Sequence, residues 1–148
     1  MASFTYEREV AAPPEVVFDV LVDHRRYAEI TPMRKSVLER EGDPAPNGVG
    51  AIRVLSSVGP ALREEVLVYQ PSTRFSYTLL SGAPVRDHVG TVELTPSGAG
   101  TKVVYAVRTT PTLPLAGPAV VAVVKQAIKQ LLSGIAKESE RRAAATNG

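Results

Sequence analysis

The chain of 148 residues contains no cysteine. This absence excludes disulfides, thiolate metal sites and a cysteine nucleophile, and it fits a reducing compartment. Histidine is almost as scarce, because His24 and His88 are the only two and no clustered carboxylates accompany either one. We therefore predict no metal site. Nucleophilic-serine, P-loop and dinucleotide signatures are also missing, and the sequence calls for no cofactor.

Acidic residues are scarce at one end of the chain only. Residues 1–110 carry 12 Lys and Arg against 13 Asp and Glu, whereas residues 111–148 carry five against two. A nucleic-acid-binding protein usually shows a denser basic stripe together with a recognisable motif, so we predict no nucleic-acid partner. The first ten residues have no basic stretch followed by an apolar run, and no signal peptide is visible. We expect a cytoplasmic protein.

One apolar run stands out, since residues 113–124 carry no charge. A membrane-spanning helix needs about 20 apolar residues, and this run ends at Lys125 after twelve, so we predict no transmembrane segment. A helix is predicted after Pro111 and Pro114 because apolar residues recur at helical spacing opposite a row of polar ones. The apolar stripe comprises Val120, Val124, Ala127, Ile128, Leu131 and Ile135, and the polar row comprises Lys125, Lys129, Ser133 and Lys137. From about residue 141 we expect a frayed tail.

The rest of the chain consists of short β-rich runs separated by turns. Residues 4–12 alternate as a strand does. Pro13 and Pro14 then fit only the start of a helix at 15–21, and a second short helix follows at 23–32 with Asp23 as its N-cap and Pro32 as its stop. Six further strands are predicted from β-branched and aromatic runs between Gly and Pro clusters, at 36–41, 51–57, 62–69, 75–81, 85–95 and 101–109.

Loops this short favour antiparallel pairing. We therefore predict one α+β domain over residues 1–148: a seven-stranded curved antiparallel sheet, two short N-terminal helices and one long C-terminal helix. A single long helix cannot fill the hollow of seven strands. The arrangement predicts a hydrophobic cavity between the sheet and the C-terminal helix.

Several segments resemble a known superfamily in their order and spacing. They are Ala12–Asp23 (APPEVVFDVLVD), then Tyr27, Pro32 and Gly48–Gly50, and later Arg74-Phe75, Gly90–Pro96 and Gly100-Thr101. Together they are similar to the polyketide cyclase/dehydrase branch of the START-like (Bet v 1-like, SRPBCC) superfamily. The resemblance implies a helix-grip fold with a hydrophobic pocket under the C-terminal helix. It implies no shared catalytic motif, since members include aromatase/cyclases, lipid and sterol carriers, quinone-binding proteins and hormone receptors. Where the family often has Trp, this chain has Ile30.

Two residues near the start of the strand at 85–95 are candidates for chemistry. If Val92 and Leu94 face the core, alternation places His88 and Arg86 on the same inward face, unless a bulge resets the phase. An inward His88 is either an acid/base group or the hydrogen-bond partner of a residue on a neighbouring strand. Alternatively, His88 does not face inward and simply ends the strand near water. Arg86 is expected at the rim, where it meets an acidic ligand head or only extends to solvent.

The candidate ligand contacts come from strands and from the last helix. The strand candidates are Phe75, Tyr77, Leu79, Val92 and Tyr105, which are either plain core or cavity wall. On the helical side we expect Leu113 and Leu115 at the cavity mouth and Val120, Val124 and Ile128 along its wall. Strand alternation places Glu64 on the same inward face as Val66 and Val68. Because an unpaired buried carboxylate is costly, either Glu64 pairs with Arg53 on the next strand or this assignment of the inward face is wrong.

Three functions fit these observations. The first is binding of a hydrophobic small molecule such as a lipid, polyketide or quinone in the cavity. The second is a polyketide cyclase or dehydratase that uses His88, Arg86 or a tyrosine for proton transfer. The third is a protein-interaction or stress/growth-regulatory module that uses the exposed apolar start of the last helix. The oligomeric state does not follow from the sequence.

Overall fold

A computed structural model describes residues 1–31, 33–57 and 59–147. In this part of the chain seven strands form one antiparallel sheet in the order β1-β7-β6-β5-β4-β3-β2. The predicted α+β helix-grip architecture is confirmed. The elements are β1 (Ala2–Val10), α1 (Pro14–Val22), a 3₁₀ turn (His24–Arg26), α2 (Tyr27–Ile30), β2 (Lys35–Arg40), β3 (Ile52–Ser56), β4 (Leu62–Gln70), β5 (Arg74–Ser81), β6 (Val85–Ser97), β7 (Gly100–Pro111) and α3 (Gly117–Asn147).

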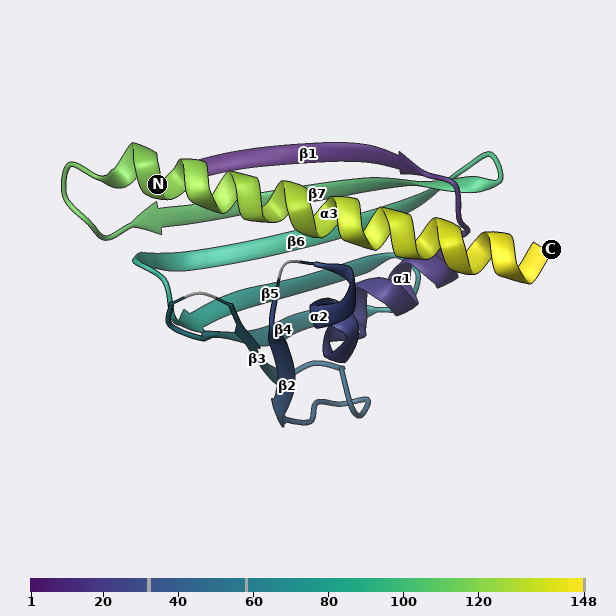
Figure 1. Ribbon diagram of the computed structural model, residues 1–148, viewed down its shortest axis with the longest axis horizontal. Coiled ribbons are helices and arrows are strands. Elements are labelled where there is room, and N and C mark those ends of the chain that lie inside the picture. Colours follow the sequence, from purple (N-terminus) through teal and green to yellow (C-terminus); the bar gives the residue numbers. More distant parts are fainter. Residues whose placement is uncertain (32, 58, 148) are drawn as a thin grey trace.

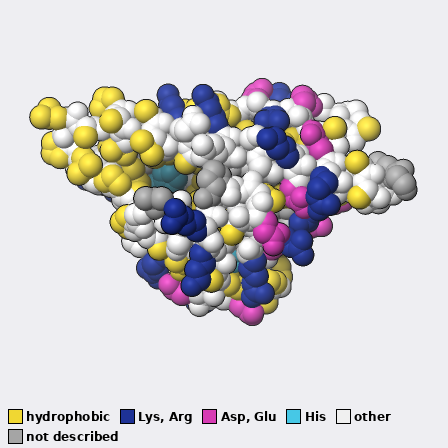
Figure 2. Space-filling view, viewed as in Figure 1, with side chains coloured by type: hydrophobic (Ala, Val, Ile, Leu, Met, Phe, Trp, Pro, Cys, Tyr) yellow, Lys and Arg dark blue, Asp and Glu magenta, His cyan; other side chains and the backbone are white. Residues whose placement is uncertain are grey.

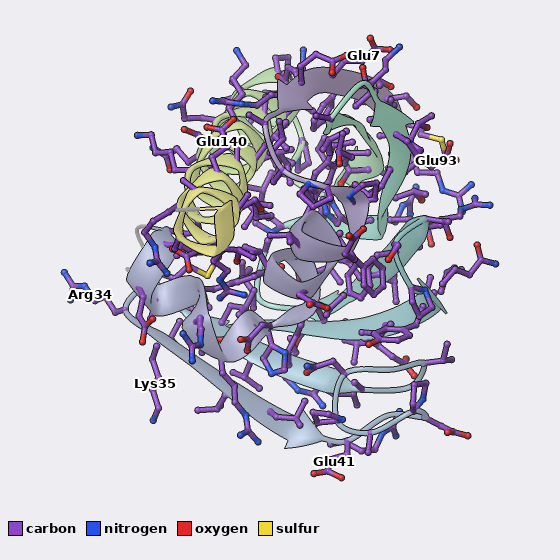
Figure 3. The ribbon with its side chains drawn as sticks, turned by 90° about the vertical axis from the view of Figure 1, so that its right-hand side faces the viewer. Glu7, Arg34, Lys35, Glu41, Glu93 and Glu140 are labelled. Atoms are coloured by element: carbon purple, nitrogen blue, oxygen red, sulfur yellow. The ribbon has the colours of Figure 1, made fainter. Side chains whose placement is uncertain are left out.

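The sheet curves around α3, which lies along its concave side (Figure 1). The two short helices carry the chain from β1 at one edge of the sheet to β2 at the other. Seen at right angles, the sheet forms an arc beside α3, and charged side chains such as Arg34, Lys35 and Glu41 point away from it (Figure 3). The interior of the arc is therefore the place where a core or a cavity can form.

Helix α1 fills one half of that interior. It starts where predicted because Pro14 occupies its first turn, where no N–H is needed, and Pro13 before it is extended. Its buried residues include Val17, Phe18 and Leu21. The Phe18 ring meets the Phe75 ring of β5 edge-on, with centroids 6.5 Å apart. Because α1 packs against the second half of α3, the space under the first half of α3 is not filled by a helix.

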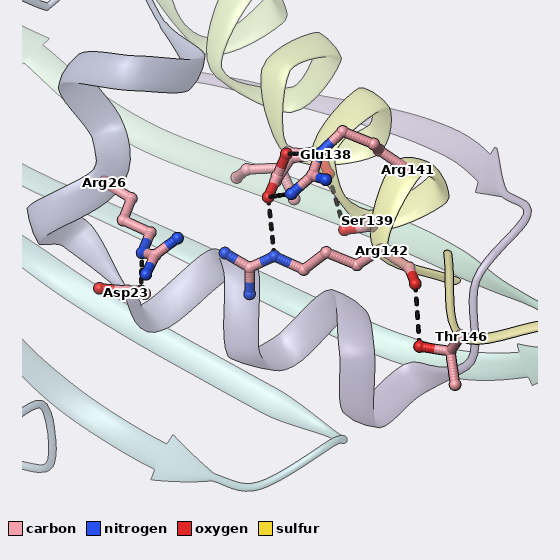
Figure 4. Close-up of polar contacts among 8 residues, drawn as sticks. Asp23, Arg26, Glu138, Ser139, Arg141, Arg142 and Thr146 are labelled. Atoms are coloured by element: carbon pink, nitrogen blue, oxygen red, sulfur yellow. Dashed lines mark hydrogen bonds and ion pairs between the residues drawn. The ribbon is translucent and has the colours of Figure 1, made fainter. Parts of the chain in front are cut away.

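The turn after α1 departs from the predicted capping. Asp23 precedes the 3₁₀ turn without a side-chain cap bond, and its carboxylate instead pairs with Arg26 at 3.3 Å (Figure 4). Pro32, predicted as the helix stop, lies outside the described residues. Helix α2 ends at Ile30, whose carbonyl oxygen would lie 2.1 Å from a Cβ at position 134. Gly134 in α3 is thus what allows the two helices to approach so closely.

Helix α3 differs along its length. Its second half is buried through Ile128, Leu132, Ile135 and Ala136, whereas Ala127, predicted in the apolar stripe, is exposed. Lys125 and Lys129 lie over the rings of Phe4 and Tyr6, at 5.6 and 5.3 Å from the ring centroids.

The C-terminal part of α3 is helical where we expected fraying from about residue 141. The helix continues to Asn147, with Ala143 buried. Arg142 donates to Glu138 at 2.8 Å, and the Thr146 hydroxyl donates to the Arg142 carbonyl at 3.0 Å (Figure 4). These side-chain hydrogen bonds stabilise the last turns of α3.

By length and composition alone, α3 is the one helix among the described residues that could cross a membrane. In this fold, however, the helix covers the concave face of the sheet and its second half belongs to the core.

Candidate functional site

A cavity of about 190 Å³ lies between the sheet and the first half of α3. Most of its wall is aliphatic, and three polar side chains, Glu64, Tyr77 and His88, reach it from neighbouring strands. The remaining lining residues are Tyr27, Met33, Leu55, Leu62, Leu79, Ala83, Val85, Val123, Val124, Ala127, Ile128 and Leu131. Figure 2 shows the molecular surface hollowed beside the start of α3, with histidine atoms at the base of the hollow.

The cavity continues into an apolar groove on the surface. This groove of about 340 Å³ is lined by Leu113, Ala116, Ala119 and Val120 at the start of α3, opposite Pro84. Ala83, Val123 and Val124 line both spaces. The two therefore form one apolar tract that leads from the polar end of the cavity to the surface.

The predicted contacts divide into three groups by position. Tyr77, Leu79, Val124 and Ile128 line the cavity, and Leu113 and Val120 line the groove. Phe75, Val92 and Tyr105 are buried core residues that do not line it. Leu115, predicted at the mouth, lines neither space and is fully exposed. Its backbone has a φ of +66°, which turns its side chain out of the groove that Leu113 enters.

A bulge at the start of β6 separates the two candidates for chemistry. The register with β7 shifts between Arg86 and Val89, and Asp87 takes a φ of +51°. The bulge moves Val85 onto the inward face and leaves Arg86 exposed. The inward face expected for Arg86 from the alternation is therefore wrong, and of its two alternatives the extension to solvent matches the structure. His88 does face the cavity as the alternation from Val92 predicted.

His88 also makes the predicted bond to a neighbouring strand. Its Nδ1 lies 3.0 Å from the Thr109 hydroxyl of β7. Burial lowers the pKa of His88, so the ring is neutral near pH 7. Nε2 makes no hydrogen bond to the residues that the structure describes, and His88 is one of the residues that line the cavity.

Glu64 and Arg53 form the ion pair that the sequence required of an inward carboxylate. Both the Nε and the Nη2 of Arg53 lie 3.0 Å from the same oxygen, Oε1 of Glu64. Burial raises the pKa of Glu64, and the guanidinium beside it counteracts this shift. Oε2 of Glu64 has no hydrogen-bond donor among the described residues, although Glu64 lines the cavity. A carboxylate oxygen is thus available to a ligand in a cavity whose wall is mostly apolar.

Aromatic rings enclose the guanidinium of Arg53. Its central carbon lies 5.6, 5.1 and 5.2 Å from the ring centroids of Tyr27, Phe75 and Tyr77. This arrangement stabilises a buried cation and holds Glu64 in place from below. Strand alternation predicted the ion pair between Arg53 and Glu64 but not the aromatic rings around it. Tyr27 belongs to a helix, and no pattern in the sequence predicts where that helix lies relative to the sheet.

Tyr77 lies across a glycine on the next strand. A Cβ at Gly90 would come within 2.5 Å of the Tyr77 ring, so only glycine allows this close approach. The hydroxyls of Tyr77 and Tyr105 are 2.5 Å apart. Burial raises the pKa of both, so they stay protonated, and one hydroxyl donates to the other while the accepting hydroxyl keeps its own O–H for another partner.

No group of three or more potential metal ligands occurs in the part of the chain that the structure describes. The two histidines lie in different parts of the fold. His88 lines the cavity, whereas His24 is buried in the 3₁₀ turn and does not reach it.

A family model described as polyketide cyclase / dehydrase and lipid transport matches residues 1–140. The chain belongs to this family. No curated protein sequence matches the chain.

Solved structures agree on the fold of this family member. A START superfamily protein from Mycobacterium smegmatis has a TM-score of 0.74 at 17% identity, covering 97% of this chain and 98% of its own. Ara h 8.0201 has a TM-score of 0.73 at 18% identity, with 97% and 98% covered. The di-domain ARO/CYC StfQ, from the steffimycin biosynthetic pathway, has a TM-score of 0.76 at 18% identity. The match covers 96% of this chain and 51% of StfQ.

Ile30 marks where the chain departs from the family's frequent Trp. It packs against the core and α3 and does not line the cavity. The cavity residues that sequence reasoning missed are mainly Met33, Leu55, Leu62, Ala83 and Val85. The strand parity that placed Glu64 would also have placed Leu55 and Leu62, whereas Met33 and Ala83 sit in connections with no periodic signal.

Proposed function

We propose that this protein binds one small hydrophobic molecule that carries a hydrogen-bond donor, with the donor directed at Glu64. The observation that carries the proposal is Oε2 of Glu64, which lines an apolar cavity and has no donor among the described residues. Oε2 is not among the fully buried polar atoms, so water can reach it in the empty cavity. A bound apolar molecule would remove that water, and a carboxylate oxygen left without a donor is costly. A ligand hydroxyl would supply that donor, while a ligand carboxylate would be repelled.

The dimensions restrict the ligand further. An apolar cavity of about 150 Å³ accommodates benzene, so the 190 Å³ here suit a head group of one or two rings. A longer apolar chain would continue along the groove past Val123 and Val124. Hydroxylated polyketides, phenols and lipid alcohols share these features, and binding requires no cofactor. The lack of cysteine supports a cytoplasmic location.

Calorimetric titration with a matched pair of probes tests the proposal. We expect 2-naphthol to bind and 2-naphthoate, which differs mainly by its charged head, to bind at least about tenfold more weakly. Glu64→Gln should narrow that preference, because the amide no longer repels the carboxylate. Arg86→Ala is the matched control and should leave both affinities unchanged. Equal binding of both probes by the wild-type protein would overturn the assignment of Glu64.

A second candidate function is acid/base chemistry on the bound molecule, of the cyclase or dehydratase type. The observation that favours it is His88, whose Nε2 has no hydrogen-bond partner among the described residues and whose ring is neutral. When Nδ1 donates to the Thr109 hydroxyl, Nε2 carries the lone pair and is a competent general base for a proton of the ligand. The StfQ match is to an ARO/CYC protein and shows the fold alone.

Substitution of His88 separates binding from catalysis. If the protein is a cyclase or dehydratase, His88→Gln should abolish most turnover of a polyketide-type substrate while changing its affinity little, because the glutamine side chain retains a hydrogen-bonding group near Thr109. Unchanged turnover by His88→Gln would remove His88 from the chemistry and leave binding as the function.

A further inference from the structure

The start of α3 presents an apolar surface that the fold leaves uncovered. Among its members Leu115 is 104% exposed, Val123 69% and Leu113 48%. We call this surface the apolar tip, and it comprises Leu113, Pro114, Leu115, Pro118, Ala119, Ala122 and Val123, all exposed. Figure 2 shows hydrophobic side chains gathered at this end of the molecule, over the N-terminal part of α3. A contiguous exposed patch of this kind marks an interaction site more often than a random surface does.

The charged side chains in the sequence segments on either side of the apolar tip are all positive. Residues 94–137 contain no Asp or Glu, and they include Lys125, Lys129 and Lys137 on α3. The ammonium groups of Lys125 and Lys129 lie over Phe4 and Tyr6 at the edge of the sheet, on exposed side chains next to the tip. An apolar surface bordered by cations is the pattern of a segment that inserts into an anionic lipid interface.

Two features argue against a protein partner for this surface. Protein interfaces are enriched in aromatic anchors, and residues 111–148 contain no Phe, Tyr or Trp. The tip also opens directly onto the apolar tract, because Val123 belongs both to the tip and to the lining of the cavity and groove. A bilayer seated on the tip would cover the mouth of that tract.

We propose that the apolar tip docks this protein onto an anionic membrane surface, with Leu115 and Val123 inserted among the acyl chains and Lys125 and Lys129 at the headgroups. In this orientation a hydrophobic molecule passes between bilayer and cavity without crossing water. The docking does not depend on the identity of the ligand, and it is tested without any ligand.

Co-sedimentation with vesicles tests the docking. The wild-type protein should pellet with vesicles of about 70% phosphatidylcholine and 30% phosphatidylglycerol and much less with phosphatidylcholine alone. Leu115→Ser/Val123→Ser should weaken binding by at least about tenfold, because two inserted apolar side chains are lost. The control Leu67→Ser/Leu80→Ser removes two leucines, each 42% exposed on the strands, and should bind like the wild type.

A second set of measurements tests the role of Lys125 and Lys129. Lys125→Glu/Lys129→Glu should lose the preference for anionic vesicles, and raising the salt to about 0.5 M should weaken wild-type binding in the same way. Circular dichroism checks that each variant is folded. Absence of wild-type binding to either vesicle overturns the proposal, and so does equal binding by Leu115→Ser/Val123→Ser. A dimer that forms through the tip in solution, detected by sedimentation and lost in Leu115→Ser/Val123→Ser, would assign the surface to a second copy of the chain instead.

Discussion

Replacing Arg53 with methionine removes the counter-charge of a buried carboxylate while keeping most of the side-chain volume. The Arg53 side chain is 3% exposed and its guanidinium lies 3.0 Å from Glu64. Removing one partner of a buried ion pair costs about 3–5 kcal/mol. We expect the upper half of that range, because the cation also lies within 5.6 Å of the Tyr27, Phe75 and Tyr77 ring centroids.

The cost should depend on pH. In the wild-type protein burial raises the pKa of Glu64, and Arg53 opposes the rise. In Arg53→Met only the raising cause is left. A carboxyl whose folded-state pKa exceeds its unfolded value favours folding below the unfolded pKa and loses that contribution as the pH rises through the folded-state pKa. The variant should therefore be least destabilised near pH 4–5 and most destabilised near pH 8.

Urea denaturation followed by circular dichroism at pH 5 and pH 7.5 measures both effects. The difference between wild type and variant cancels the titration of groups that the two share. Arg53→Met/Glu64→Leu removes both charges and should recover most of the lost free energy of unfolding. The reasoning is refuted if Arg53→Met costs less than about 1 kcal/mol at pH 7.5, if the cost is equal at both pH values, or if the double variant is no more stable than the single.

Further predictions concern Gly90, His24 and Glu138. Gly90→Ala should destabilise by about 1–3 kcal/mol in thermal unfolding, since its Cβ would lie 2.5 Å from the Tyr77 ring; Gly117→Ala, whose nearest contact is 3.7 Å away, is the control and should be neutral or stabilising. Burial and the neighbouring Arg53 lower the pKa of His24 to about 4, so the free energy of unfolding should fall as the pH drops from 6.5 towards 4. His24→Leu should lack that part of the slope in urea titrations, and an identical slope would contradict the burial argument. Glu138→Gln should cost less than about 1 kcal/mol in urea, because Arg141, one of its two ion-pair partners, is 66% exposed.

Much of the fold follows from local patterns in the sequence. Strands β4, β5 and β7 begin and end within two residues of the predicted bounds, because β-branched runs alternate with Gly and Pro turns. The same period of two predicted that Glu64 meets Arg53 and that His88 meets a neighbouring strand. Both contacts exist, since each depends only on pairing between adjacent strands.

The errors arise where tertiary packing or a special backbone angle decides. Arg86 lies at a bulge, and the period of two cannot predict on which face of the strand a bulged residue lies. Leu115 turns out of the groove at a positive φ that leucine seldom adopts. Ala127, placed in the apolar stripe by helical spacing, does line the cavity, although it is exposed.

Native mass spectrometry of gently purified protein tests the central claim most directly, because it asks whether the cavity holds a molecule. We expect one small hydroxylated apolar molecule per chain, displaced by 2-naphthol. Val124→Phe, which adds bulk where cavity and groove meet, should carry none. An adduct that Val124→Phe retains would contradict the account, as would a bare wild-type chain that also takes up no 2-naphthol.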